Sequence, residues 1–172
     1  MPKRKTGDED TSKSSSKKKS KKDDDDDDED VEMHPNAKSY EERLKALSPI
    51  ASPLADEKLT KKVHKLVKKA SSAKVLRRGV KEVVKAVRKG ATGLCVIAGD
   101  IAPVDVICHL PVFCEEKSVP YIYVPSKQDL GFAALTKRPT SCVLVSPKPG
   151  QTFDHQDLLD KTTAKVKKAL GL

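Results

Sequence analysis

Three short runs of apolar, β-forming residues occur in the second half of the chain, separated by segments with helical periodicity. They are Leu94–Ala98, Tyr121–Val124 and Cys142–Val145. Unbroken apolar runs of this length are typical of strands buried on both faces. Because helices alternate with them, the sequence predicts an α/β fold, a three-layer α/β/α sandwich around a small mixed sheet of about four strands. A weaker strand is expected at residues 74–76.

Amphipathic helical segments fill the intervals around these strands. Serine, proline and glycine mark their ends, because these residues cap helices or cannot continue them. Ser52 is expected to cap the second helix with Pro53 at its first position, and Pro111 to kink or restart the helix that begins at Pro103. The expected helices cover residues 40–47, 53 onward, 80–89, 103–113, 128–134 and 154–170.

Charge is divided unevenly along the 172 residues. Residues 1–32 carry 9 Lys and Arg against 12 Asp and Glu, a net charge of −3. Residues 33–172 carry 25 against 13, a net charge of +12. We expect residues 1–35 to form a disordered Lys/Ser-rich and then Asp-rich tail, and residues 36–172 a single domain. A compact basic domain indicates a polyanion partner, with nucleic acid favoured over an anionic membrane surface.

The tail contains two charged runs. Residues 17–22 form a basic cluster of the kind that directs nuclear import. Residues 23–28 are six consecutive aspartates. The acidic run either mimics nucleic acid and holds the basic run in check, or it only solvates the tail.

Several classes of protein are disfavoured by what the sequence lacks. No apolar run approaches the roughly 20 residues that span a bilayer, and the charged N-terminus is no secretory signal. The four cysteines form no C-x-x-C pair, so no metal site is expected, and Cys95 and Cys142 are expected to be buried thiols. Neither a dinucleotide-binding nor a P-loop glycine pattern occurs, so no cofactor and no small-molecule substrate are expected. Aromatic residues, at 3%, are too few for a base-stacking platform.

The sequence disfavours an enzymatic function. Asp100 follows a strand, and Cys114 or His109 could act as nucleophile or base. No partner group stands at a persuasive spacing, so no catalytic residue is assigned. Asp100 is expected to brace the following turn, and Cys108 and His109 to pack in or beside the core.

The segment that follows Gly79 forms an amphipathic helix with a cationic outer face. Val80, Val83, Val84 and Val87 fall at positions i, i+3, i+4 and i+7, which is one apolar face. Basic side chains lie off that face, and Glu82 lies in the first turn, where the helix dipole favours a carboxylate. Cations can hold phosphates and a carboxylate can accept from a base amine, although a solvated lysine face is an alternative interpretation.

Two further stretches, residues 98–103 and 109–131, together with residues 79–85, resemble the kink-turn RNA-binding family of ribosomal and small nucleolar ribonucleoprotein proteins. The resemblance extends over roughly residues 40–170. It implies an α/β/α sandwich whose RNA surface joins the glycine-opened helix to the loop at residues 135–139. The RNA-binding residues that it implies are Arg78, Gly79, Lys81, Glu82, Lys85, Lys127, Thr136, Lys137 and Arg138.

The resemblance also implies a role for each of these residues. Gly79 would let the backbone approach RNA closely, and Glu82 would accept from a guanine edge. Arg78, Lys85 and Lys127 would contact the RNA backbone, and the loop would pack under a flipped-out nucleotide.

Two positions depart from the family pattern. Lys81 replaces an asparagine, and an ammonium only donates, whereas an amide also accepts. Leu135 replaces a small residue. Kink-turns should therefore be recognised less specifically, as in the H/ACA branch of the family.

That branch implies a non-catalytic RNA-binding subunit supporting guide-RNA-directed pseudouridylation and rRNA processing in the nucleus and nucleolus. Its implied partners are the H/ACA guide RNA, the pseudouridine synthase subunit and two small accessory proteins. The alternative is a kink-turn-specific box C/D, spliceosomal or ribosomal protein of the same family. A pure protein-interaction module is a further alternative, with residues 104–116 presenting the partner surface.

Overall fold

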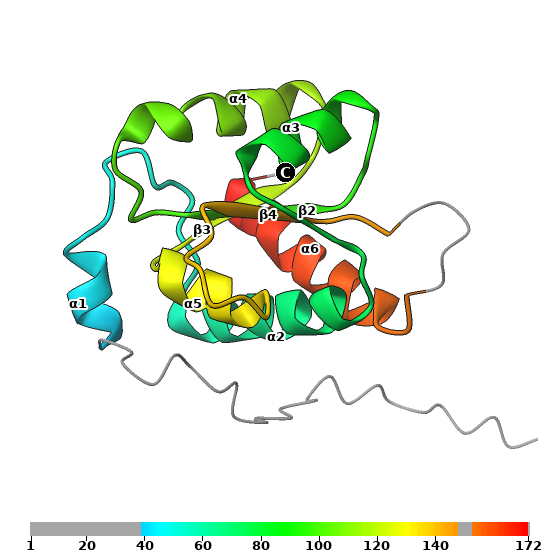
Figure 1. Ribbon diagram of the computed structural model, residues 1–172, viewed down its shortest axis with the longest axis horizontal. Helices are drawn as coiled ribbons and strands as arrows, with labels where there is room; N and C mark the ends of the chain where they lie inside the picture. Colours follow the sequence, from blue (N-terminus) through cyan, green and yellow to red (C-terminus); the bar gives the residue numbers. More distant parts are fainter. Residues whose placement is uncertain (1–38, 148–152, 172) are drawn as a thin grey trace, which may run out of the picture.

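The computed structural model describes residues 39–147 and 153–171, which form one mixed sheet covered by helices on both faces (Figure 1). The sheet order is β1-β4-β2-β3. The strands are β1 (Leu76–Arg78), β2 (Leu94–Ala98), β3 (Tyr121–Val124) and β4 (Cys142–Val145). The predicted four-stranded α/β/α fold is thus confirmed. The proposed tail, with its basic and acidic runs, lies outside the described residues.

Strand direction is set by β4, which runs antiparallel to both of its neighbours. Val143 of β4 pairs with Arg78 of β1 on one side and Val96 of β2 on the other. β3 pairs with β2 in parallel, with Val96 opposite Ile122. β1, β2 and β3 therefore run in one direction, and β4 in the other.

Helices cover the two faces of the sheet as separate layers (Figure 1). One layer contains α2 (Glu57–Ser72), α5 (Lys127–Ala133) and α6 (Gln156–Leu170). The other contains α3 (Val80–Arg88) and α4 (His109–Glu116). Because successive side chains of a strand point to opposite faces, Val96 and Val143 join the α2–α5–α6 core, whereas Ile97 and Leu144 join the α3–α4 core.

The expected start of the second helix was wrong. α2 begins at Glu57 with Asp56 at its N-cap, not at Ser52 and Pro53. The backbone before it lies along β3: Tyr123 N donates to Pro53 O at 3.0 Å, and Ala55 N donates to Tyr123 O at 2.9 Å. These bonds hold the chain extended, and the helix begins only beyond them.

Two further expectations are corrected near the sheet. β1 lies at Leu76–Arg78 rather than at residues 74–76, since Lys74 has a φ of 57° and turns the chain instead. The helix expected from Pro103 divides into a 3-10 turn at Val104–Val106 and α4, so the restart precedes Pro111. Pro111 lies in the first turn of α4, where a missing N–H is tolerated.

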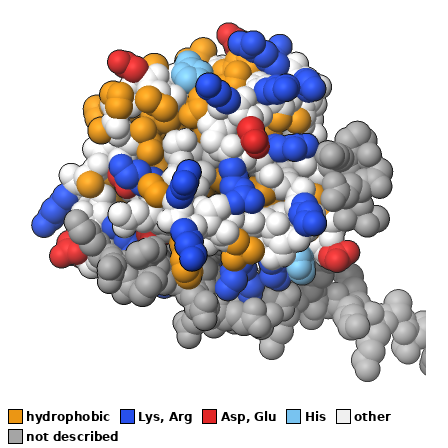
Figure 2. All heavy atoms as spheres, in the orientation of Figure 1, with side chains coloured by type: hydrophobic (Ala, Val, Ile, Leu, Met, Phe, Trp, Pro, Cys, Tyr) orange, Lys and Arg blue, Asp and Glu red, His pale blue; other side chains and the backbone are white. Residues whose placement is uncertain are grey.

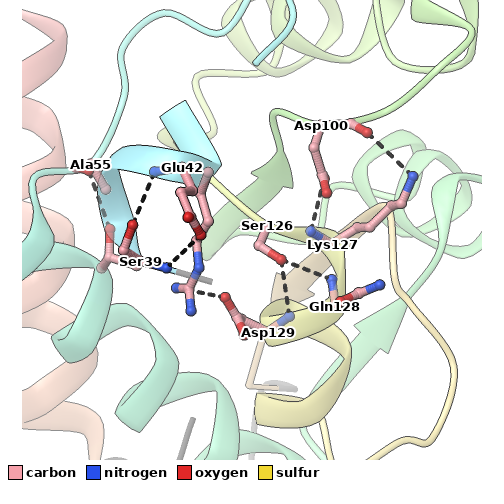
Figure 3. A network of polar contacts seen from close by, with 10 residues as sticks. Ser39, Glu42, Ala55, Asp100, Ser126, Lys127, Gln128 and Asp129 are labelled. Carbon is pink, nitrogen blue, oxygen red and sulfur yellow. Dashed lines mark hydrogen bonds and ion pairs between the residues drawn. The ribbon is translucent and has the colours of Figure 1, made fainter. Parts of the chain in front are cut away.

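The short helix α1 (Tyr40–Leu44) begins at a capping box. The Ser39 side chain accepts from Glu42 N, and the Glu42 carboxylate accepts from Ser39 N (Figure 3). The Tyr40 hydroxyl donates to Ala55 O at 2.8 Å. α1 is thereby tied to the segment that leads into α2.

Cysteine burial matches the expectation for Cys95 and Cys142, which are buried free thiols, and Cys114 is buried as well. Cys108 and His109 are exposed, contrary to expectation. Leu110 and Cys114, four residues apart, occupy the inward face of α4. Among the helices described, none is long and apolar enough to cross a bilayer.

A buried ion pair joins α1 to α5. Arg43 Nη1 lies 2.7 Å from Asp129 Oδ2, and both side chains are almost fully shielded from solvent. His64 of α2 is also buried, and its pKa is lowered to about 4, first by burial and then by the charge of Arg43. The interior of this layer thus holds one balanced charge pair beside a neutral imidazole.

We expect Asp129→Asn to lower the free energy of unfolding by about 3 kcal/mol, because the change removes the carboxylate that pairs with the buried Arg43 guanidinium. Urea denaturation would measure the change. Glu57→Gln is the matched control, since it breaks only the exposed pair with Lys61, which is worth about 0.5 kcal/mol or less. The double change Arg43→Met, Asp129→Leu should recover most of the loss. Equal effects of Asp129→Asn and Glu57→Gln would contradict the buried pair.

His64 also predicts a pH dependence of stability. Its folded pKa of about 4 lies below the ordinary 6.5, so its stabilisation is complete above pH 6.5 and is lost as the pH falls toward 4. The gap corresponds to about 3 kcal/mol. Urea midpoints at pH 7 and pH 4.5 should therefore fall more for the wild type than for His64→Leu. The exposed His109→Gln should follow the wild type, and parallel curves for all three would exclude this contribution.

Candidate nucleic-acid interface

One edge of the sheet gathers four chain segments. Because β1, β2 and β3 are parallel, their carboxyl ends lie at the same edge as the start of β4. Ala98 N donates to Ser141 O at 2.8 Å, and Gly79 N donates to Cys142 O at 2.9 Å. Two strand ends are therefore bonded to consecutive residues at the start of β4.

A groove of about 700 Å³ opens at this edge, between the end of β1 and the loop that precedes β4. Five of the nine predicted residues line it: Arg78, Gly79, Thr136, Lys137 and Arg138. Pro139, which lies in the loop that the resemblance indicated, also lines it, as do Thr140 and Ser141, which the sequence had not indicated. We call this the β1 groove. The predicted juxtaposition of the glycine turn with the loop is present in the structure.

The loop of the β1 groove rests on Gly131 of α5. Thr136 N donates to Gly131 O at 3.0 Å, and the Thr136 hydroxyl lies 3.0 Å from the carbonyl oxygens of both Gly131 and Arg138. A Cβ on Gly131 would collide with the Arg138 carbonyl oxygen. Leu135 has a φ of 56° and is 55% exposed. The absence of a side chain at Gly131 is thus what lets the loop lie on the helix.

Gly79 forms the turn that opens α3. Its φ of 83° and ψ of 153° belong to a region that is essentially restricted to glycine. No atom lies within 4 Å of where its Cβ would be, so the requirement is conformational and the surface there is open. Its own N–H already donates to Cys142. The N–H groups of Val80, Lys81 and Glu82 precede the first helical bond, Val83 N to Gly79 O.

Glu82 braces this turn. Its Oε2 accepts from Arg78 N at 3.4 Å, so the carboxylate lies against the backbone beside the β1 groove. A backbone hydrogen bond from Arg78 therefore holds Glu82, the predicted acceptor of a base amine, in place.

Lys81 and Lys85 of α3 do not line the β1 groove. They line a separate hollow of about 600 Å³ between α3 and α4, with Val80 and Val84 as its apolar wall. Arg88, Lys89 and His109 also line it, and none of the three was among the predicted site residues. The spacing of Lys81, Lys85 and Arg88 along the helix could have indicated Arg88.

Lys127 lines neither hollow. Its backbone N–H donates to Asp100 Oδ1 at 2.8 Å, and its Nζ donates to Asp100 O at 3.3 Å (Figure 3). Asp100 therefore holds the start of α5, rather than the turn directly after it that the sequence indicated, and burial raises its pKa. Lys127 O in turn accepts from Thr140 N at 3.0 Å, which connects the helix start to the β1-groove loop.

The electrostatics of this region favour an anion. Each hollow is lined by Lys and Arg, and neither has an Asp or Glu in its lining. On the face of the molecule drawn in Figure 2, Lys and Arg side chains are widely spread and Asp and Glu are few and scattered. Within the described residues, no group of three or more His, Cys, Asp and Glu could hold a metal ion.

The chain is similar to known proteins in both sequence and fold. Residues 61–152 match the model of the Ribosomal protein L7Ae/L30e/S12e/Gadd45 family. An H/ACA ribonucleoprotein complex subunit 2-like protein of Arabidopsis thaliana is 59% identical over 121 residues, 70% of this chain and 75% of that protein. H/ACA ribonucleoprotein complex subunit 2 of Bos taurus is 48% identical over 127 residues, 74% of this chain and 83% of that protein. The solved structure of the Giardia lamblia 15.5kD RNA binding protein superposes with a TM-score of 0.66 at 32% identity, covering 72% of this chain and 99% of that one.

Gly131→Ala should displace the β1-groove loop, because the new methyl group would take the place of the Arg138 carbonyl. We expect the free energy of unfolding to fall by about 1–3 kcal/mol. Hydrogen exchange should show faster exchange at the N–H groups of Thr136 and Thr140. Gln128→Ala on the exposed side of the same helix is the control. Unchanged protection of both amides in Gly131→Ala would contradict the packing described.

Proposed function

Because the chain belongs to the ribosomal protein L7Ae/L30e/S12e/Gadd45 family, we propose that it is a non-catalytic RNA-binding subunit of an H/ACA ribonucleoprotein. The observation that carries the proposal is the β1 groove, in which Arg78 and Gly79 face Thr136, Lys137 and Arg138. Relatives named H/ACA ribonucleoprotein complex subunit 2 that match more than two thirds of this chain support the assignment to that complex.

RNA phosphates fit the cations of the β1 groove. Arg78 and Arg138 can each hold two phosphate oxygens through a planar guanidinium, and Lys137 adds a point charge. The open surface at Gly79 lets an RNA backbone approach without meeting a side chain. The groove would thus position the RNA, whereas base recognition falls to neighbouring groups.

Two groups beside the β1 groove can contact bases. Glu82, held near Arg78, can accept from a guanine amine, as a carboxylate does for exocyclic amines. The exposed side chain of Leu135 can pack against an unstacked base, the form in which RNA bases are most often recognised. A sharply bent RNA exposes both guanine edges and unstacked bases.

Lys81 supports broad rather than kink-turn-specific binding. It lies in the hollow between α3 and α4 with Lys85, beyond the turn of Gly79. An ammonium there donates without accepting, so it attracts phosphate and distinguishes bases poorly. We propose that specificity comes from the assembled complex.

The proposed assembly contains the H/ACA guide RNA, the pseudouridine synthase subunit and two small accessory proteins, and it acts in the nucleus and nucleolus. The chain would support pseudouridylation and rRNA processing by holding RNA. Asp100 is engaged with Lys127, so it braces the start of α5 and is not assigned to chemistry.

Binding of the full chain to two RNAs tests the proposal: a kink-turn hairpin and a straight hairpin of equal length. Arg78→Gln, Arg138→Gln should weaken binding to both by about 10- to 100-fold, since two charge-assisted contacts are removed. Lys58→Gln, Lys168→Gln removes the same charge from exposed positions outside the hollows and is the matched control.

Lys81→Asn, in the same assay, should raise the preference for the kink-turn hairpin, because an amide can both donate and accept. If the arginine variant binds like the control, the β1 groove is not the RNA site. RNA and proteins that copurify with the tagged chain test its complex: H/ACA guides with a pseudouridine synthase support the proposal, and box C/D guides replace it.

A further inference from the structure

A third basic hollow is a groove between α2 and α6, which pack side by side in the helical layer that does not contain α3 (Figure 1). It encloses about 300 Å³. Five lysines line it against two aspartates, a formal charge of +3 with His155 neutral. We call it the lysine groove. The lysines are Lys62, Lys65 and Lys69 of α2, and Lys161 and Lys165 of α6.

Helical spacing brings these lysines together. Lys62, Lys65 and Lys69 stand at i, i+3 and i+7 along α2, and Lys161 and Lys165 at i and i+4 along α6, so each set lies on one face of its helix. The three α2 lysines are half-buried, whereas the lysines elsewhere on that helix are exposed. Half-burial of this kind is typical of lysines whose aliphatic stems pack along a surface.

The lysine groove is connected to the β1 groove through the end of α2. The Ser71 hydroxyl donates to Ala134 O at 2.9 Å, directly before the loop that begins at Leu135. Lys69 lies two residues before Ser71. Exposed Lys74 then leads into β1, whose last residue is Arg78 of the β1 groove. Basic residues thus follow the chain from one groove to the other.

We propose that the lysine groove binds a second segment of the phosphate backbone of the RNA held in the β1 groove. The inference rests on the proposed function. It follows from the charge of the lysine groove and its continuity with the first site. The two grooves have separate linings, so an RNA that reaches both must extend beyond the segment held in the β1 groove. Two separated contacts along one strand would raise affinity through effective concentration.

RNA length is the variable that tests this proposal in the full chain. The short RNA is a kink-turn hairpin, and the long RNA carries one further turn of duplex on its stem. The wild type should bind the long RNA about tenfold more tightly. Lys62→Gln, Lys161→Gln should lose most of that gain and bind the short RNA as the wild type does. The dependence of log K on log salt for the long RNA should weaken by about 1 for each lysine removed.

The matched control, Lys58→Gln, Lys168→Gln, takes one exposed lysine from each of the same helices and should keep the gain. The proposal would be overturned if the two variants bound each RNA with equal affinity, or if the wild type bound the long RNA no more tightly than the short one. Either result would leave the proposed role of the β1 groove intact. Failure of the proposed function is a different result, in which Arg78→Gln, Arg138→Gln binds the short RNA normally. Tighter binding of the short RNA by the Lys62→Gln, Lys161→Gln variant would also overturn the proposal. It would indicate that the lysine groove binds an acidic protein segment, such as residues 23–30.

Discussion

The reversed direction of β4 is the constraint on which the rest of the molecule depends. Since β4 lies between β1 and β2 and runs against both, the ends of those strands meet at its first residues. Gly79 bonds to Cys142 and Ala98 bonds to Ser141. The turn that opens α3 and the loop that follows α5 are thereby held against each other, although they are far apart in the sequence. A sheet with β4 parallel to its neighbours would place them at opposite edges.

Local signals were sufficient for most of the fold. The three apolar runs became strands buried on both faces, and the valine spacing after Gly79 became α3 with its buried face inward. The failures arose where a distant backbone decides the conformation. Ser52 and Pro53 carry a good capping signal, but the N–H and C=O of Tyr123 hold the following residues extended. Such a bond leaves no trace in the composition of either segment.

Prediction of the site was limited in the same way. Resemblance and charge led us to propose nine residues, and five of them share the β1 groove, because both segments begin or end at paired strands. Lys81 and Lys85 occupy another hollow, and Lys127 is bonded to Asp100. Gly131 was missed, because its importance comes from a carbonyl group that crosses it from a later loop. A glycine within a helical segment does not indicate in the sequence which later part of the chain packs against it.

Leu135 has a consequence for how the loop meets a ligand. A non-glycine residue at a φ of 56° stores roughly 1–3 kcal/mol of backbone strain, and it persists only where its surroundings dictate the conformation. The hydrogen bonds of the Thr136 hydroxyl to the carbonyl oxygens of Gly131 and Arg138 fix the conformation of the neighbouring backbone. Hydrogen bonds within the chain thus hold the loop in this conformation, with the Leu135 side chain presented to solvent. A ligand that settles on it loses little further conformational entropy, and more of the contact free energy appears as affinity.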